Sequence, residues 1–338
     1  MNPYKYFVLI LFTIILNCCK SNDSNPSNQW MEVKGDNFQY LNDMSFINSE
    51  EGIVVGYSYP KLGVLPDCQV FKTINGGNSW NLIQTWSLGT GRKYYSYVSG
   101  LTTQLYYSCD GLNVFKTVDG GLSWQGVGIL NSQIYNNGDF IFFDENTGLA
   151  IGGSKINRTS DGGKNWKTVY LFNIENSDFN RIVTTKNQNV FIYGSFERDS
   201  VGVYHGGILK SIDKGQSFSK LSTPFDVVSD LSFINDDTGF AFSRDKKIYK
   251  TIDSGSNWTF INTITGNGAS KFYFINEFEG YIFGSGEIWH TLDGGKSWQT
   301  DYSTLNSQNF NIIISPDNNV TIYAMPYIGS ILKKRIQF

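Results

Sequence analysis

Residues 70–80 read VFKTINGGNSW, and this stretch decides the fold because its pattern returns five more times without a gap. The starts of the copies lie 44, 42, 52, 40 and 40 residues apart. A period of this length is typical of a repeat architecture in which each copy is one supersecondary unit. The later copies are VFKTVDGGLSW at 114–124, INRTSDGGKNW at 156–166, ILKSIDKGQSF at 208–218, IYKTIDSGSNW at 248–258 and IWHTLDGGKSW at 288–298.

A second pattern lies upstream of these copies. It reads SFINSEEGIVVG at 45–56, IFFDENTGLAIG at 141–152, SFINDDTGFAFS at 232–243 and YFINEFEGYIFG at 273–284. Each stretch is an apolar strand, a short polar turn and another apolar strand, which predicts a hairpin. The downstream copy adds a third strand, a turn and a fourth strand. Four antiparallel strands in about 40–45 residues predict one blade of a β-propeller.

A seventh copy is split between the two ends of the sequence. Residues 312–325 (IIISPDNNVTIYAM) repeat the hairpin and 331–334 (ILKK) repeat the third strand, but no Trp follows. Residues 27–33 (SNQWMEV) match the segment around Trp298, so we expect Trp30 to begin the missing fourth strand. The sequence therefore predicts an all-β, seven-bladed propeller of four-stranded antiparallel blades, with the last blade closed by the N-terminal strand.

The repeated turn has its own chemistry, Ser/Thr-x-Asp-x-Gly-x-Ser/Asn-Trp. An Asp or Asn at the third position accepts hydrogen bonds from the backbone of its own turn, and the Gly suits a positive φ. We therefore expect the acidic residues to build turns and not to bind metal or catalyse. These structural positions are Asn75, Asp119, Asp161, Asp213, Asp253 and Asp293, followed by Trp80, Trp124, Trp166, Trp258 and Trp298, with Phe218 once in place of Trp.

These residues resemble the Asp-box, or bacterial neuraminidase repeat, over essentially residues 30–338. Sialidases share the repeat but need an arginine triad, and too few of the six arginines here stand at equivalent strand starts to predict one. With its exported start and blade pattern, the chain is most similar to the photosystem II assembly and stability factor family of exported lipoproteins. That resemblance implies a seven-bladed, non-catalytic binding scaffold. It does not carry over that family's partner, because the sequence has no compact arginine cluster.

The first residues predict export. Residues 7–16 (FVLILFTIIL) form an apolar run too short to span a bilayer, as in a secretory signal. The following Leu-Asn-Cys-Cys resembles a lipoprotein cleavage box with Cys19 as the lipidated residue, and Cys18 as the alternative acceptor. We expect a signal peptide at 1–18, a flexible tether at 19–29 and the propeller at 30–338, anchored by lipid in a bacterial membrane, in first place the outer one. A secreted or periplasmic protein is the alternative.

Composition excludes several function classes. The net charge of −3 and the pI near 5.5 argue against nucleic acid as a partner. With two histidines, no metal site is expected, and no motif indicates a cofactor. Only Cys68 and Cys109 remain after processing. They form a disulfide, which export would permit, or stay as two buried thiols.

Candidate binding residues come first from the long loops that a propeller gathers on one face. Tyrosines with a few charges suit glycan stacking or a protein contact, unless they cap neighbouring blades. The candidates, taken together with the arginines, are Tyr57, Tyr59, Arg92, Tyr94, Tyr135, Arg181, Arg198, Tyr204 and His205.

A second set comes from the repeat register. We expect the residue five positions before the turn-entry residue of each first hairpin to ring a mouth of the central channel. These residues are Asp43, Tyr95, Asp139, Asn180, Asp230, Lys271 and Phe310. The three carboxylates, Asp43, Asp139 and Asp230, would bind a cation or a polyhydroxyl ligand, or would be solvated residues at strand starts.

The function expected from these observations is a non-catalytic, monomeric binding or assembly scaffold. It would recognise a protein or glycan of the cell envelope through the loop-rich face. The alternative is a carbohydrate-binding module or an Asp-box glycoside hydrolase, which needs two carboxylates about 5–9.5 Å apart.

Overall fold

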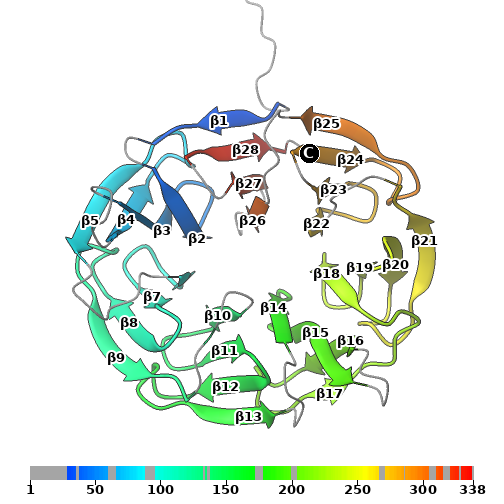
Figure 1. Cartoon of the computed structure of the whole chain (residues 1–338), viewed down its shortest axis with the longest axis horizontal. Helices are drawn as coiled ribbons and strands as arrows, with labels where there is room; N and C mark the ends of the chain where they lie inside the picture. The colour runs from blue at the N-terminus through cyan, green and yellow to red at the C-terminus, as the bar shows by residue number, and fades with distance from the viewer. Residues whose placement is uncertain are drawn as a thin grey trace, which may run out of the picture.

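A computed structural model of the chain has only β-strands as regular elements in the residues that it describes. These residues are 29–35, 38–59, 66–87, 96–131, 134, 138–171, 178–198, 204–265, 271–284, 286–303, 310–314, 320–326 and 329–336. They form seven four-stranded antiparallel sheets arranged as blades around a central opening (Figure 1). The predicted seven-bladed propeller is confirmed. No helix in the described ranges is long and apolar enough to cross a membrane.

The strands follow the repeat in chain order. Blade 1 holds β2 (Tyr40–Phe46), β3 (Gly52–Ser58), β4 (Asp67–Thr73) and β5 (Asn81–Ser87). Blade 2 holds β6 (Tyr97–Gly100), β7 (Tyr106–Cys109), β8 (Asn113–Thr117) and β9 (Gln125–Ile129). Blade 3 holds β10 (Asp139–Phe142), β11 (Gly148–Gly152), β12 (Lys155–Thr159) and β13 (Lys167–Leu171). Blade 4 holds β14 (Asp178–Thr184), β15 (Val190–Arg198), β16 (Tyr204–Ser211) and β17 (Ser219–Lys220).

The remaining blades complete the ring. Blade 5 holds β18 (Val228–Phe233), β19 (Gly239–Ser243), β20 (Lys247–Thr251) and β21 (Thr259–Thr263). Blade 6 holds β22 (Lys271–Phe274), β23 (Gly280–Phe283), β24 (Glu287–Thr291) and β25 (Gln299–Ser303). Blade 7 joins β26 (Phe310–Ile314), β27 (Thr321–Pro326) and β28 (Ile331–Arg335) to β1 (Met31–Val33).

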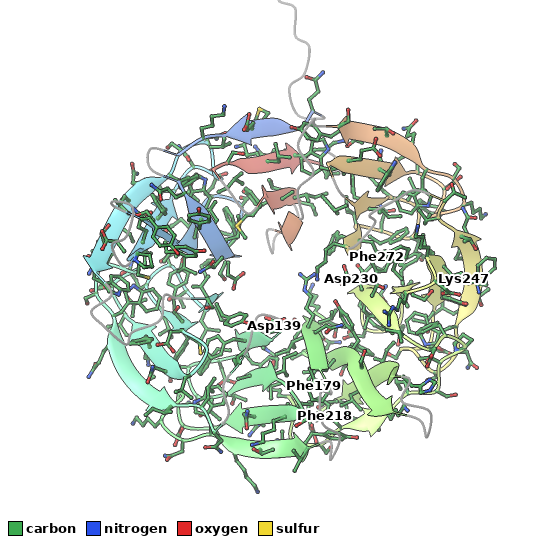
Figure 2. All side chains as sticks on the ribbon, in the orientation of Figure 1. Asp139, Phe179, Phe218, Asp230, Lys247 and Phe272 are labelled. Carbon is green, nitrogen blue, oxygen red and sulfur yellow. The ribbon has the colours of Figure 1, made fainter. Side chains whose placement is uncertain are left out.

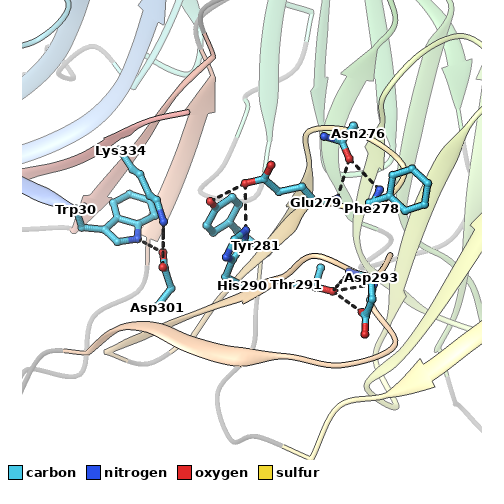
Figure 3. Close-up of polar contacts among 11 residues, drawn as sticks. Trp30, Asn276, Phe278, Glu279, Tyr281, His290, Thr291, Asp293, Asp301 and Lys334 are labelled. Atoms are coloured by element: carbon cyan, nitrogen blue, oxygen red, sulfur yellow. Dashed lines mark hydrogen bonds and ion pairs between the residues drawn. The ribbon is translucent and has the colours of Figure 1, made fainter. Parts of the chain in front are cut away.

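The N-terminal strand closes the ring as expected. β1 pairs antiparallel with β28, with Met31 opposite Lys333. Trp30, just before β1, donates from Nε1 to Asp301 Oδ2 of blade 6 (2.6 Å), and Lys334 pairs with the same carboxylate at 2.8 Å (Figure 3). The closing strand is therefore held on one side by the backbone of its own blade and on the other by a charged contact to the previous blade.

The Asp-box turns have the chemistry expected from sequence. In blade 5, Thr251 Oγ1 donates to Asp253 Oδ1 (2.8 Å) and accepts from the N–H of Gly255 (2.9 Å). The same carboxylate accepts from the N–H of Asn257 (2.8 Å), and Trp258 Nε1 donates to the Gly255 carbonyl (3.0 Å). Gly255 has φ +84°, which a side chain would disfavour. Equivalent hydroxyl bonds are made to Asn75, Asp119, Asp161, Asp213 and Asp293.

Each Asp-box turn lies beside the first-hairpin turn of its own blade. The N–H of Gly76 donates to the Glu50 carbonyl (2.9 Å), and that of Gly294 to the Phe278 carbonyl (2.8 Å). These turns define one face of the ring, which we call the Asp-box face. The connections between second and third strands and between blades lie at the opposite ends of the strands, and we call that side the loop-rich face.

Stacked aromatic rings join neighbouring blades, and these contacts account for part of the high aromatic content of the chain. The last residue of an innermost strand stacks on the second strand of the blade before it. Phe142 stacks on Tyr107 with ring centroids 3.6 Å apart, and Phe274 on Phe240 at 3.6 Å. The two described cysteines, Cys68 in β4 and Cys109 in β7, are buried thiols and not a disulfide, so the thiol alternative holds for them.

Candidate functional site at the channel mouth

A ring of side chains lies at the loop-rich end of the innermost strands, and Figure 2 places Asp139 and Asp230 at the edge of the central opening. Its register is set by the first-hairpin turns. The opening residue of each turn donates its N–H to the carbonyl four residues on, as Leu101 does to Leu105 (3.0 Å). The ring residue lies four positions earlier. In blades 1 to 6 these residues are Asp43, Tyr97, Asp139, Arg181, Asp230 and Lys271, and β-sheet pairing puts Asn311 there in blade 7.

Three ring positions therefore differ from the sequence prediction. In blade 4 the first-hairpin turn opens at Thr185, so the ring residue is Arg181 and not Asn180. The β-bulge that leaves Asn180 out of the pairing recurs at the same place in blades 1 and 5, just before Asp43 and Asp230. In blade 2 the residue is Tyr97, and Tyr95 lies outside the described residues. In blade 7 the ring position belongs to Asn311, and the predicted Phe310 is the residue before it in β26.

The three ring carboxylates are fastened to the backbone of the next blade. Asp43 Oδ2 accepts from the N–H of Val98 (2.9 Å), Asp139 Oδ2 from Ile182 (2.9 Å) and Asp230 Oδ2 from Phe272 (2.8 Å). In each case the other oxygen accepts the N–H of the residue that follows the aspartate. They are thus staples between blades 1 and 2, 3 and 4, and 5 and 6, and not solvated residues at strand starts.

Asp230 is the most enclosed of the three. It is fully buried, and its Oδ1 also accepts a hydrogen bond from the Tyr193 hydroxyl at 2.7 Å. Arg181 Nη1 lies 3.8 Å from the same oxygen, while the Arg181 side chain keeps 32% of its surface exposed. The guanidinium thus supports a buried carboxylate and still reaches solvent in the channel. No group of three or more His, Cys, Asp and Glu residues in the described ranges could hold a metal ion.

Burial raises the pKa of two ring carboxyl groups and lowers the pKa of the ring lysine. It raises the pKa of Asp43 to about 7, with the nearby charge of Asp139 adding to the effect. It also raises the pKa of Asp139, which Arg181 partly offsets. For Lys271, burial lowers the pKa, and the negative charge of Asp230 opposes that shift. A cluster of such shifts at a channel mouth marks a candidate functional site.

Among the ring residues whose side chains the structure describes, Lys271 stands apart. Its ammonium group has no hydrogen bond or ion pair with any residue that the structure describes, although Asp230 and Arg181 act on it electrostatically. A partly buried ammonium normally finds an acceptor. The Lys271 ammonium group could therefore bind an anionic group of a ligand, and the partly exposed Arg181 belongs to the same ring.

Asp43 makes stability depend on pH in a definite direction. The ordinary pKa is 3.8 and the folded value about 7, so between them the folded chain holds a proton that the unfolded chain releases. Stability from this group is full below pH 4 and falls as the pH rises to about 7, by up to ~1.4 kcal/mol per pH unit. Asp43→Asn should flatten the curve of melting temperature against pH over this window. The exposed Asp237→Asn is the control, and an unchanged slope in Asp43→Asn would contradict the assignment.

The loop candidates of blade 1 lie together. Tyr57 is buried in β3 and stacks on Tyr40 with ring centroids 4.7 Å apart, and Tyr59 packs edge-on against both at 5.7 Å. Only Tyr59, 45% exposed, offers a ring to a ligand. Tyr57 thus completes the blade, and the repeat comparison did not single out Tyr40.

Three other candidates, Arg198, Tyr204 and His205, lie on a long hairpin of blade 4. β15 and β16 remain paired as far as Arg198 opposite Tyr204, beyond the length of the equivalent strands in blade 5. His205 Nδ1 lies 2.7 Å from Asp226 Oδ1, in the connection to blade 5. This hairpin and the blade 1 tyrosines belong to separate blades, and neither is part of the ring. Arg92, Tyr94 and Tyr135 lie outside the described residues.

Fold and ring together define a seven-bladed Asp-box propeller whose channel mouth carries stapled carboxylates and two cations. Residues 210–308 match the family model described as Photosynthesis system II assembly factor YCF48, which confirms the resemblance drawn from the repeats. The comparison with curated proteins found no match.

Solved structures share the architecture. The structure titled YCF48 bound to D1 peptide is 19% identical, with a TM-score of 0.68, and the match covers 92% of this chain and 98% of that one. YCF48 from Cyanidioschyzon merolae is 17% identical, with a TM-score of 0.64 over 90% and 98% of the two chains. The GH74 xyloglucanase from Xanthomonas campestris is 8% identical, with a TM-score of 0.54 over 88% of this chain and 59% of that one. At these identities the likeness concerns the fold alone.

Proposed function

We propose that this chain is a non-catalytic protein-binding propeller that takes a carboxylate-bearing peptide segment of another protein at the channel mouth. The observation that carries the proposal is Lys271, a partly buried ammonium without a hydrogen bond or ion pair in the described chain. Arg181 adds a second cation with solvent access. A peptide carboxylate would satisfy the ammonium group and bring its own backbone groups to the loop-rich face.

The role of the aspartates favours binding over hydrolysis. A hydrolase of the Asp-box type would need carboxylates free to donate or accept a proton at a glycosidic bond. Asp43, Asp139 and Asp230 instead each accept two backbone N–H groups, which fasten one blade to the next. The family whose model matches residues 210–308 consists of assembly factors, and one solved relative holds a peptide. Both facts support a protein partner.

The proposal includes a place in the cell. The apolar run at 7–16 and the cysteines at 18 and 19 support export and lipid anchoring at Cys19, in first place in a bacterial outer membrane. The polar stretch 20–28 would serve as the tether. These residues lie outside the described ranges, so the argument rests on their sequence.

Binding should depend on Lys271 and on the peptide carboxylate. The test is fluorescence polarisation with a pooled library of synthetic hexapeptides, made once with a free C-terminal carboxylate and once with a C-terminal amide. We expect the carboxylate pool to bind, and Lys271→Met to weaken that binding about tenfold or more, since a charge-assisted bond is lost.

Lys247→Met is the matched control. Lys247 carries the same charge near the loop-rich end of blade 5, but it is paired with Asp245 at 2.7 Å. Its replacement should change affinity less than about twofold, as rim charges do. Equal binding of the amidated pool, or equal losses in the two variants, would overturn the carboxylate site. Turnover of any member of an envelope-glycan panel would overturn the non-catalytic assignment.

A further inference from the structure

The position of β1 decides from which face the N-terminal tether leaves the propeller. In every other blade the outermost strand begins directly after the Asp-box turn, and β1 takes that place in blade 7. Met31 pairs with Lys333, and Lys333 Nζ donates to the carbonyl of Gly76 in the Asp-box turn of blade 1 (3.1 Å). Gln29 and Trp30 therefore lie at the Asp-box face, away from the channel-mouth ring.

The same face carries the most exposed apolar side chains of the described residues. Six large hydrophobic residues have exposed fractions between 64% and 77%, and all six lie on turns of the Asp-box face. Five of them occupy one position, between the hydroxyl and the acidic residue of an Asp-box. The set, which we call the aliphatic ring, is Ile74, Val118, Ile212, Ile252 and Leu292, with Phe278 beside it on the first-hairpin turn of blade 6.

The turn does not need an apolar residue at this position. In blade 3 the position is held by Ser160, and that turn makes the same bonds, from Thr159 Oγ1 to Asp161 Oδ1 (2.9 Å) and from the N–H of Gly163 to Thr159 Oγ1 (3.0 Å). Exposed aliphatic side chains at five of the six turns thus serve something other than folding. Their recurrence around one face indicates a broad surface as the partner.

We infer that the Asp-box face lies against the lipid bilayer and that the channel mouth points away from it; this rests on the lipid anchor in the proposed function. The tether from residue 19 to residue 29 has eleven residues, and such a polar chain has a mean span of about 18 Å. The anchor therefore keeps the aliphatic ring close to the membrane surface. Weak contacts count under such tethering because the effective concentration is high.

Charge on this face selects the kind of bilayer. The carboxylates of Asp119, Asp213, Asp253 and Asp293 lie on the same turns as the aliphatic ring, and hydrogen bonds within these turns hold the pKa of each below the ordinary range. Lysines lie on the same face, where Lys72, Lys214 and Lys250 pair with Glu51, Asp144 and Glu277, so the face carries charges of both signs. A zwitterionic surface fits it best.

Labels at the two ends of one strand test this orientation. Ile252 and Arg244 are both exposed and flank β20 on the Asp-box face and the loop-rich face, about 17 Å apart. Ile252→Cys and Arg244→Cys would each carry an environment-sensitive dye. The native thiols of Cys68 and Cys109 are buried and should stay unlabelled. Burial also raises the pKa of Cys109, which makes its thiol less reactive. The mature chain is joined to phosphatidylcholine vesicles by its own acyl group, or by a hexahistidine tag that replaces Cys19 and binds a nickel-chelating lipid, with a quencher on the lipid headgroups.

We expect the dye at position 252 to be quenched at least about twice as strongly as the dye at 244, because only the former lies within headgroup reach. Changing the other four members of the aliphatic ring to Ser, on the precedent of Ser160, should reduce the difference. Equal quenching, or stronger quenching at 244, would overturn the orientation. The mass of the N-terminal peptide from native membranes tests the anchor separately: a missing acyl group refutes the anchor, while the histidine-tag arm still reports the orientation.

Discussion

Asp230→Ala is expected to lower the free energy of unfolding by about 4 kcal/mol, the largest effect of any ring substitution. The carboxylate is fully buried and accepts from the Tyr193 hydroxyl and from the N–H groups of Leu231 and Phe272. Alanine would leave all three donors without this acceptor. It would also remove the anion nearest to Arg181 and the staple between blades 5 and 6. Urea unfolding of the purified chain measures the change.

The control for this experiment is Asp226→Ala. The Asp226 side chain is 58% exposed and pairs with His205, which is itself partly exposed. An exposed pair of this kind contributes at most about 1 kcal/mol. If Asp230→Ala cost no more than Asp226→Ala, the ring aspartates would not be the staples that their geometry describes.

Trp30→Ala is expected to cost about 3 kcal/mol and to open the ring at its seam. The indole packs edge-on against Tyr281 and Phe283 of blade 6, with ring centroids 6.2 Å and 6.0 Å away. Its Nε1 also donates to Asp301 (2.6 Å), which Lys334 holds from the other side (Figure 3). Without the indole, β1 keeps its short pairing with β28 and the packing of Val33 against the core between blades 7 and 1. Thermal unfolding and limited proteolysis near the N-terminus would report the loss together.

Met31→Ala is the matched control within the same strand, because the Met31 side chain is 40% exposed. Its cost should stay below about 1 kcal/mol, as for most surface substitutions. Equal destabilisation by the two variants would show that closure depends on strand pairing alone and not on the Trp30 anchor.

The Asp-box turns could be predicted from sequence because their bonds are local. Thr251, Asp253 and Gly255 lie within five residues of one another, and their hydrogen bonds close one turn. The split blade was predictable for a related reason. Trp30 occupies the place of the repeated Trp before a strand, so the repeat itself shows what the last blade lacks.

The channel mouth could be predicted only in part. Asp43, Asp139 and Asp230 were assigned to it from the repeat register, but their bonds to the next blade could not be foreseen. Arg181 stands in the ring instead of Asn180 because the first-hairpin turn of blade 4 opens at Thr185, and the stretch TTKNQN at 184–189 does not mark that opening clearly in the sequence. That Lys271 makes no hydrogen bond or ion pair with the described residues likewise depends on the side chains around it and not on its place in the repeat.

The sequence by itself determined the number of blades, the turn chemistry and the closure by an N-terminal strand, since these depend on residue spacing and on bonds within a few residues. The tertiary structure decided which ring charges are tied into staples, which cation lacks a partner, and that the tether and the aliphatic ring share a face. The physical reason is that these features arise where blades about 40 residues apart along the chain pack side by side. There burial, and not sequence distance, sets the energy of each charge.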